Sequence, residues 1–387
     1  MPDTPMNQPP MSEEKLRRLR DYYENGLSVD GIPQKVKDHL ARVKAMGGGQ
    51  GIEFLSNLNK DYLGAFMAPF SREVENADIV VVGQPLEKSA PMNASHKYGP
   101  KVIRELSKNF MGTTEPWLDG DFDVPFDEAR IIDYGNIDTY GQFELADEVR
   151  YVLEHYEKIV TEAGCAVMTF GGDHTASYAP MHVLGKRHGP LGVIHIDAHY
   201  DLVTHADFPY PYHSGAMFSR NYAEGCIDPN RHIQIGIRGR MTGLVGGHAK
   251  NFGVTAVMAD EARRMSPEEM AAQIIEVVGE GPTYITLDLD GLDAVYNSAS
   301  SAVEPFGLDA CWLWDVFREV RASGKVNLVG ADIMEYAPYC DPAKTFGYYA
   351  AAFGWKLLCW LANDVAKRNG ERRGTVWPQA FGSVTLG

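Results

Sequence analysis

The stretch that most constrains the fold runs from Val193 to Asp201 and reads Val-Ile-His-Ile-Asp-Ala-His-Tyr-Asp. An apolar, β-branched run leads there into three strong metal ligands spaced two residues apart. Side chains alternate between the two faces of an extended strand, so we expect Asp197, His199 and Asp201 to share one face. Burying these groups without a partner costs several kcal/mol each, which indicates a cation site. A hydrophilic strand end at the surface gives the same alternation, so this stretch alone leaves both interpretations open.

Apolar runs of strand length alternate with helical periodicity along most of the chain. Strands are predicted at 77–83, 129–135, 165–170, 193–201, 232–238, 283–290 and 327–335, and helices at 145–163, 176–187, 266–278 and 345–368. This alternation predicts an α/β fold of three layers, with helices on both faces of a mainly parallel sheet. Ligands of such sheets collect beyond the carboxyl ends of the strands.

The first 75 residues differ from the rest of the chain. They begin with a Pro-rich tail that is predicted to be disordered, and residues 11–24 predict a capped, charged helix. We expect residues 1–75 to be an N-terminal extension with a helical arm that packs on the core or on a neighbouring subunit. Residues 76–387 are then a single catalytic domain.

Composition excludes several classes of protein. The formal net charge of −16 disfavours nucleic acid and anionic membranes as partners and mildly favours a cationic substrate. The five cysteines are scattered without a CxxC spacing, so neither a disulfide framework nor a thiolate zinc site is indicated. No apolar run approaches the ~20 residues of a membrane span, and the N-terminus lacks the order of a signal peptide. We therefore expect a cytoplasmic protein.

Ligand-type side chains follow three separate predicted strands. They are His174, then Asp197, His199 and Asp201, then Asp288 and Asp290. Two imidazoles and four carboxylates suit Mn²⁺ or another first-row divalent ion. Shared carboxylates could bridge a metal pair ~3.5–4 Å apart, as in two-metal hydrolases.

These residues also carry a family resemblance. The segments 171–174, 197–201 and 288–293 resemble the three metal motifs of the ureohydrolases, the arginase and agmatinase family. Further similarity lies at 98–104, 234–238 and 332–335, and the resemblance extends from about residue 77 to 365. It implies that His174, Asp197, Asp201 and Asp288 hold one metal ion, and that Asp197, His199, Asp288 and Asp290 hold the other.

The resemblance also implies roles in catalysis. A hydroxide that bridges the two ions is the expected nucleophile, and Asp201 is expected to pass its proton to the departing amine. Glu335 matches the carboxylate that clamps the substrate guanidinium. His213 matches a proton-shuttling histidine, although here Ser214 separates it from the glycine that follows it in the family. A structural loop histidine is the alternative interpretation.

The loop at 202–212 departs from the arginase pattern. Arginases carry a Ser/Asn-rich loop there that reads the α-amino acid head group, whereas this loop has neither residue type and is aromatic and proline-rich. Walls made by Phe208, Tyr210 and Tyr212 favour a small or apolar guanidine, although each ring could instead simply pack the loop. Arginase activity is therefore not expected.

Two further departures affect the expected substrate. Residues 294–302 replace a Thr-Gly-Thr-Pro stretch of the family, and His96 stands where agmatinases carry Arg-rich sequence and could reach the pocket. With the N-terminal arm, these changes make the chain most similar to the guanidine hydrolase branch. That branch acts on guanidine or short N-alkyl guanidines and favours nickel, and it includes metformin-hydrolysing subunits of hetero-oligomers. The ligands alone do not decide between Ni²⁺ and Mn²⁺.

We therefore expect a binuclear-metal hydrolase that cleaves a small guanidino compound to urea, or a urea analogue, plus ammonia or an amine. An agmatinase or guanidino-acid hydrolase is the alternative, for which Asp207 or Glu304 could bind the second charge of agmatine. A non-catalytic partner subunit is the alternative from another class, and the six retained ligands argue against it. The family resemblance implies a homo-oligomer, trimeric or hexameric, or a hetero-oligomer with a homologous subunit.

Overall fold

The computed structural model describes residues 11–25, 33–38, 41, 64–90, 95–110, 115–118, 122–139, 141–239 and 242–375. The chain divides into two units, Met1–Leu55 and Ser56–Gly387. The first unit contains helix α1, Glu13–Asn25, which begins where the Ser12 Oγ accepts the Lys15 N–H at 3.2 Å. The expected disordered tail lies outside the described residues, and so does most of 26–63.

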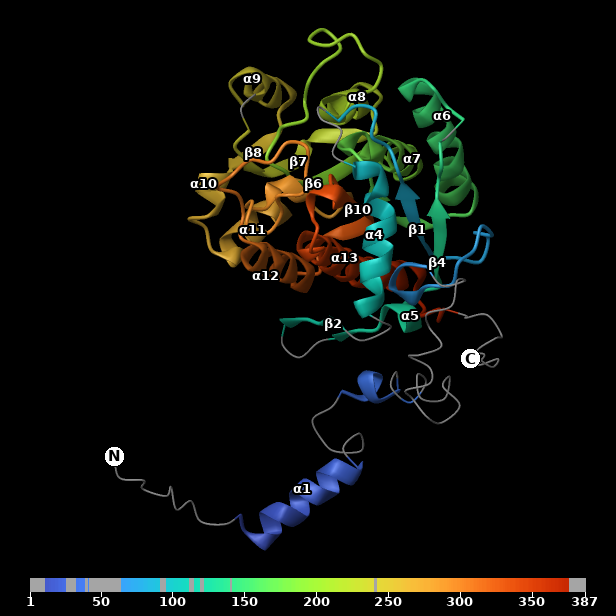
Figure 1. Ribbon diagram of the computed structural model, residues 1–387, viewed down its shortest axis with the longest axis vertical. Coiled ribbons are helices and arrows are strands. Elements are labelled where there is room, and N and C mark those ends of the chain that lie inside the picture. The colour runs from blue at the N-terminus through green and yellow to red at the C-terminus, as the bar shows by residue number, and fades with distance from the viewer. Residues whose placement is uncertain are drawn as a thin grey trace. The chain divides into compact units, whose positions relative to one another are not determined.

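The second unit is built on one sheet of eight parallel strands (Figure 1). Its strand order is β4-β1-β5-β10-β9-β6-β7-β8, so the expected mainly parallel sheet is confirmed. The strands are β1 Ile79–Gln84, β4 Ile131–Asn136, β5 Ala166–Gly171, β6 Leu191–Ile196, β7 Ile227–Ile237, β8 Thr255–Met258, β9 Pro282–Asp288 and β10 Asn327–Met334. A separate antiparallel pair joins β2, Glu115–Pro116, to β3, Phe122–Asp123.

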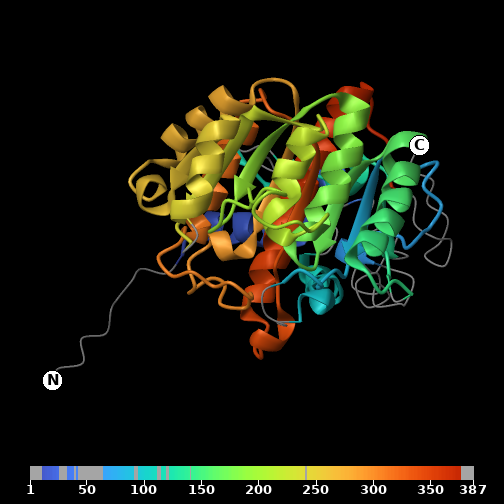
Figure 2. The same cartoon turned by 90° about the horizontal axis from the view of Figure 1, so that it is seen from above.

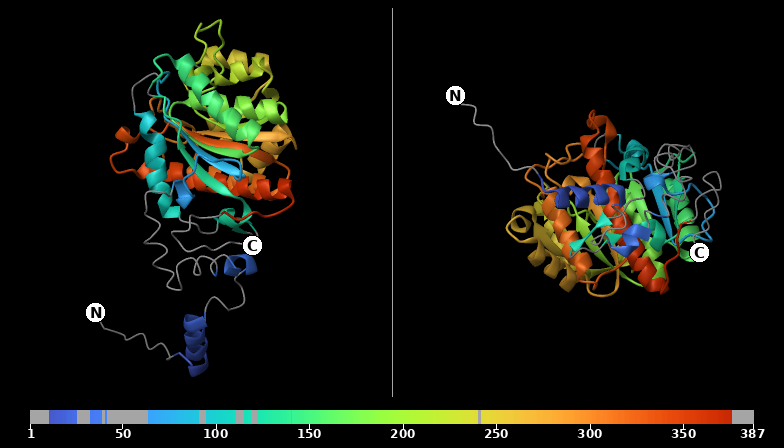
Figure 3. Two further views of the ribbon diagram at one scale, coloured as in Figure 1. Left: turned by 90° about the vertical axis from the view of Figure 1, so that its right-hand side faces the viewer. Right: turned by 90° about the horizontal axis from the view of Figure 1, so that it is seen from below.

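Two apolar clusters cover the two faces of the sheet. Along β1, Ile79 and Val81 belong to one cluster and Val80 and Val82 to the other, as the alternation of a doubly buried strand requires. Figures 2 and 3 show the sheet between its two helical layers. One layer holds α4 Gly99–Ser107, α5 Pro125–Glu128, α11 Pro267–Val278, α12 Ala310–Ala322 and α13 Thr345–Asn369. The other holds α6 Leu145–Tyr156, α7 Tyr178–His188, α8 Met217–Ala223 and α9 Thr242–Phe252.

The strand expected at 193–201 is shorter in the structure. β6 ends at Ile196, and residues 197–201 form a loop in which Asp201 has a φ of 49°. The expectation that strand alternation places the three ligands on one face is therefore wrong. Backbone turns bring them together instead, and one such turn is fixed by the His199 N–H, which donates to Asp197 Oδ1 at 2.6 Å.

The start of the second unit also differs from the expected boundary at residue 75. Phe66 is fully buried, and the Ala65 N–H donates to Asp133 Oδ2 at 2.6 Å, so residues 65–68 are packed into the second unit. Strand β8 and helices α9 and α12 had no counterpart among the predicted elements. None of the described helices, including the 25-residue α13, is long and apolar enough to cross a bilayer.

Candidate metal centre

The ligand-type residues converge beyond the carboxyl ends of three strands. His174 follows β5, Asp197 follows β6, and Asp288 ends β9. β9 lies next to β6, and β10 separates it from β5. Parallel strands bring their carboxyl ends to one edge of the sheet, which is why residues more than a hundred positions apart meet there.

His174 is the centre of the first group of ligands. Its Nδ1 lies 3.2 Å from Asp197 Oδ2, 3.0 Å from Asp201 Oδ2 and 3.2 Å from Asp288 Oδ2. Nδ1 is buried and has no hydrogen-bond partner among the described residues. Three carboxylate oxygens therefore surround a ring nitrogen without pairing with it in hydrogen-bond geometry.

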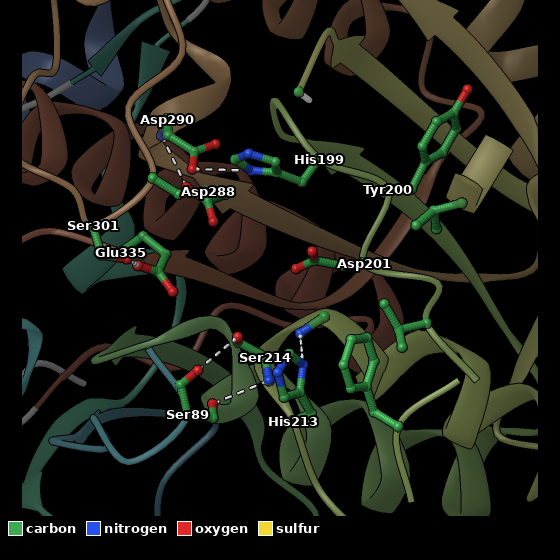
Figure 4. A pocket seen from close by; sticks show the side chains of 16 residues that line it. Ser89, His199, Tyr200, Asp201, His213, Ser214, Asp288, Asp290, Ser301 and Glu335 are labelled. Carbon is green, nitrogen blue, oxygen red and sulfur yellow. Dashed lines mark hydrogen bonds and ion pairs between the residues drawn. The ribbon is translucent and has the colours of Figure 1, made fainter. Parts of the chain in front are cut away.

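His199 is the centre of the second group. Its Nδ1 lies 3.4 Å from Asp197 Oδ1 and 3.3 Å from Asp290 Oδ2. Asp197 thus presents one oxygen to each histidine and links the two groups. Gly239 is required beside this ring, because a Cβ there would lie 2.4 Å from His199 Cδ2. Figure 4 shows His199, Asp288 and Asp290 on one side of the cavity and Asp201 projecting into it.

The donor set fits divalent cations. Ligand atoms about 2.1 Å from an ion lie about 3 Å apart at adjacent octahedral positions, which is the spacing around His174. Burial and the neighbouring Asp197 raise the pKa of Asp201 to about 7, and burial with Asp290 and Asp197 raises that of Asp288 well above its ordinary value. Such a cluster of buried carboxylates requires a compensating positive charge.

Further residues, to which the sequence assigned no role, orient these ligands. The Gln234 Nε2–H donates to His195 Nδ1 at 3.0 Å, so His195 Nε2 carries the proton and donates to Asp197 Oδ2 at 2.7 Å. On the other side, Thr286 Oγ1 lies 2.9 Å from His174 Nε2 and donates to Asp332 at 2.6 Å. Such contacts fix the ring orientation of metal-binding histidines. The sequence signal for His195 was a polar residue inside a buried apolar strand.

Glu335 lies beside the ligand cluster at the end of β10. Its Oε1 accepts the His174 backbone N–H at 2.9 Å, and its Oε2 lies 3.0 Å from His96 Nε2 and 3.4 Å from Ser301 Oγ. The φ of Glu335 is 63°, a left-handed conformation that costs a non-glycine residue about 1–3 kcal/mol and is typical of functional sites. His96 is fully buried behind Glu335 and does not line the cavity.

A cavity of about 320 Å³ opens onto these groups (Figure 4). Asp201, Asp288, Asp290 and Glu335 line it together with His213 and Phe208. The His213 Nδ1 accepts the Gly215 N–H at 2.9 Å, so in the neutral ring the proton is on Nε2. Phe208 lies parallel to the His213 ring, with the centroids 5.9 Å apart.

The remaining candidates for substrate contact lie outside the cavity wall. Tyr212 packs edge-on against Tyr178 and under the Arg220 guanidinium, and Tyr210 is 64% exposed. Neither ring lines the cavity, unlike Phe208 of the same loop. Glu304 does not line the cavity either, and its Oε1 lies 3.9 Å from His199 Nε2.

The fold and the acidic site together define the class of protein: a hydrolase of the ureohydrolase type. The chain belongs to the arginase family, because the model of that family matches residues 77–359. Relatives at 30% identity or more are named as a guanidino acid hydrolase and an agmatinase, so the predicted class of enzyme, a ureohydrolase, is confirmed.

Several known proteins resemble this chain over most of their length. The mitochondrial guanidino acid hydrolase of Homo sapiens is 32% identical over 294 residues, covering 76% of this chain and 81% of that protein. The mitochondrial agmatinase of Gallus gallus is 31% identical over 303 residues, covering 76% and 84%. The structure of proclavaminate amidino hydrolase from Streptomyces clavuligerus superposes with a TM-score of 0.70 at 28% identity, covering 79% of this chain and 99% of that one.

Proposed function

We propose that this chain hydrolyses guanidine, a short N-alkyl guanidine or a biguanide such as metformin, releasing urea or a urea analogue and ammonia or an amine. The composition of the cavity wall carries this proposal. Among the described residues that line the cavity, none is a lysine or an arginine. A guanidino acid needs such a cation for its carboxylate, because an unpaired buried charge is costly.

The same wall argues against a second charge on the substrate. Beyond Glu335 and the ligand cluster, its described side chains carry no carboxylate, and the apolar Val203, Phe208, Val245 and Ala302 are among them. Agmatine needs a further carboxylate for its amine, and Asp207 already accepts the Thr204 N–H at 2.8 Å and pairs with His248. An apolar wall instead suits hydrogen or a short alkyl group on the guanidine nitrogen.

Each titratable group around the cavity has a proposed part in the reaction. When two divalent ions are bound, they lower the pKa of water and stabilise the charge that develops at the guanidine carbon. Glu335 binds the guanidinium by paired, charge-assisted hydrogen bonds and orients it. His96, behind Glu335, keeps that carboxylate ionised and in place. Asp201 passes a proton to the departing amine, and His213 carries a proton at Nε2 between the cavity and solvent.

The ligand sets and the assembly are also part of the proposal. His174, Asp197, Asp201 and Asp288 hold one ion, and Asp197, His199, Asp288 and Asp290 hold the other. We propose Ni²⁺ or Mn²⁺ as these ions, an oligomer as the working form and the cytoplasm as its location. The relatives named above from Homo sapiens and Gallus gallus are mitochondrial, so the location remains a prediction.

Release of urea or a urea analogue, and of ammonia or an amine, from a panel of substrates tests the proposal. The panel contains guanidine, methylguanidine, metformin, agmatine, guanidinobutyrate and arginine, each offered to the nickel-loaded and the manganese-loaded protein. We expect turnover to be confined to the first three substrates. Phe208→Ala enlarges the cavity and is expected to change the relative rates among these three. Preference for agmatine or guanidinobutyrate would contradict the proposal and would indicate an agmatinase or a guanidino acid hydrolase instead. Silence on every substrate would support a non-catalytic partner subunit.

A further inference from the structure

A second recess lies at the end of the sheet opposite the metal centre, where the strands begin. Its described lining comes from the segment before β1, the first residue of β5 and the last turns of α7 and α13. Its volume is about 260 Å³. The metal centre lies beyond the carboxyl ends of the strands, whereas this recess lies at their amino ends, so it is not part of that site.

Two arginines of this recess, Arg187 and Arg368, are held in place but have no carboxylate partner. Arg187 Nη1 donates to the carbonyl oxygens of Val160 and Thr161. Arg368 Nη1 donates to the Leu328 carbonyl at 2.6 Å and to Asn327 Oδ1 at 2.8 Å. Within the described part of the chain, neither guanidinium forms an ion pair, and the Nε and Nη2 groups of both have no acceptor.

Two more arginines line the recess and are already neutralised. Arg130 Nε lies 3.2 Å from Asp78 Oδ2, and Arg373 Nη1 lies 3.6 Å from Asp78 Oδ1. The described lining thus holds four arginines but only two acidic residues, Asp78 and the exposed Glu75. This excess of cations is unusual on a chain with a net charge of −16.

The pKa of His188 is affected by the positive charges inside the recess. Burial, followed by the charges of Arg187 and Arg368, lowers the pKa of His188 to about 4. Burial likewise lowers the pKa of Arg368, although Asp364 opposes that shift. The charges of Arg187 and Arg368 are therefore partly desolvated, and neither is in an ion pair with a described carboxylate.

The helix dipole is a simpler explanation for why two arginines occur at these positions. It does not explain why both side chains point into the same recess. Arg187 and Arg368 stand in the last turns of α7 and α13, where cations favourably interact with the helix dipole. That effect requires no particular direction of the side chains. Here both guanidiniums instead converge on one hollow beside His188, and each is fixed by backbone carbonyls of a different segment.

We propose that this recess binds a small oxyanion, held between the free edges of Arg187 and Arg368 with His188 as a third hydrogen-bonding group. The planar guanidinium presents parallel N–H groups that match the oxygens of a phosphate or carboxylate. Because one nitrogen of each guanidinium is already anchored, little side-chain entropy is lost on binding. Inorganic phosphate is the probe that matches this chemistry most simply.

Calorimetry with inorganic phosphate on the full-length, metal-loaded protein tests the proposal. Arg187→Gln and Arg368→Gln are each expected to weaken phosphate binding at least tenfold. Arg264→Gln is the matched control, because it removes an exposed arginine that follows α10, Ala259–Ala262, and is far from the recess in sequence. It is expected to leave phosphate binding unchanged.

The nuclear magnetic resonance signal of the His188 ring gives a second readout that is independent of the metal centre. Phosphate is expected to raise the pKa of His188, and His188→Gln assigns the signal. Phosphate affinity that is equal in the parent and in both arginine variants would overturn the proposal, because binding would then occur elsewhere. The absence of binding, or a His188 signal unaffected by phosphate, would overturn it as well.

Discussion

His96 Nε2 lies 3.0 Å from Glu335 Oε2, and both side chains are buried. Burial lowers the pKa of His96, but Glu335, Asp173 and Glu87 together raise it more, so the net pKa is above 6.5. Burial raises the pKa of Glu335, and His96 and the His174 N–H reverse that shift, so its net pKa is below 4.5. The proposed guanidinium clamp is therefore one half of a buried ion pair.

The His96–Glu335 pair makes stability depend on pH. The His96 contribution is present below pH about 6.5 and is lost as the pH rises through its higher folded pKa. The Glu335 contribution is present above pH about 4.3 and is lost as the pH falls through its lower folded pKa. We expect His96→Gln to reduce stability most between these limits, as measured by denaturant unfolding from pH 4 to 9. A constant difference between the variant and the parent would contradict the pairing.

Replacing Glu335 tests the clamp itself. Glu335→Gln keeps the size of the side chain but removes the charge, so hydrogen bonds to the guanidinium lose their charge assistance. Each such bond is worth about 1.5–3 kcal/mol, and we expect kcat/KM to fall roughly 100-fold with KM raised and kcat lowered together. Ser301→Ala is the control, since its Oγ is a weak partner at 3.4 Å and should matter little. Normal kinetics in Glu335→Gln would remove it from substrate binding.

Metal affinity should depend on pH near neutrality. The pKa of Asp201 is raised to about 7, so in metal-free protein the folded state retains a proton that the unfolded state has lost between about pH 4 and 7. Stability of the metal-free protein is thus expected to fall as the pH rises from 5 to 8. Added Mn²⁺ should raise the melting temperature most at pH 8, where Asp201 has already lost its proton. A metal-induced shift that is largest at pH 5 would contradict the shared carboxylate cluster.

Gly239 gives a test of the second ligand group that does not alter any ligand. A Cβ at this position would lie 2.4 Å from His199 Cδ2 and 2.9 Å from Nε2, so the ring has to move. We expect Gly239→Ala to bind about one ion per chain instead of two and to lose most of its activity. Gly247→Ala is the matched control, because a Cβ there meets nothing within 4 Å. Two ions bound to both variants would mean that His199 is not a ligand.

The architecture could be predicted because buried parallel strands are continuous apolar runs, as in β1 and β5. The short edge strand β8 was missed, since Thr255–Met258 offers only four residues of pattern. Ligand types were readable at strand ends, but their geometry was not. In the loop after Ile196, the backbone of Asp201 adopts a left-handed conformation, which no residue pattern in the sequence predicts. That Phe208 lines the cavity while Tyr210 and Tyr212 do not likewise depends on tertiary packing.

Urea release from guanidine during metal titration tests the central claim most directly. Metal-free protein is titrated with Mn²⁺, and separately with Ni²⁺, while urea formation and bound metal are measured in the same samples. A paired-metal guanidine hydrolase is expected to be inactive without metal and to reach its plateau at about two ions per chain. Asp201→Asn should give no turnover at any metal level while keeping the fold. Full activity at one ion per chain, activity in Asp201→Asn, or no urea at any metal level would contradict the account.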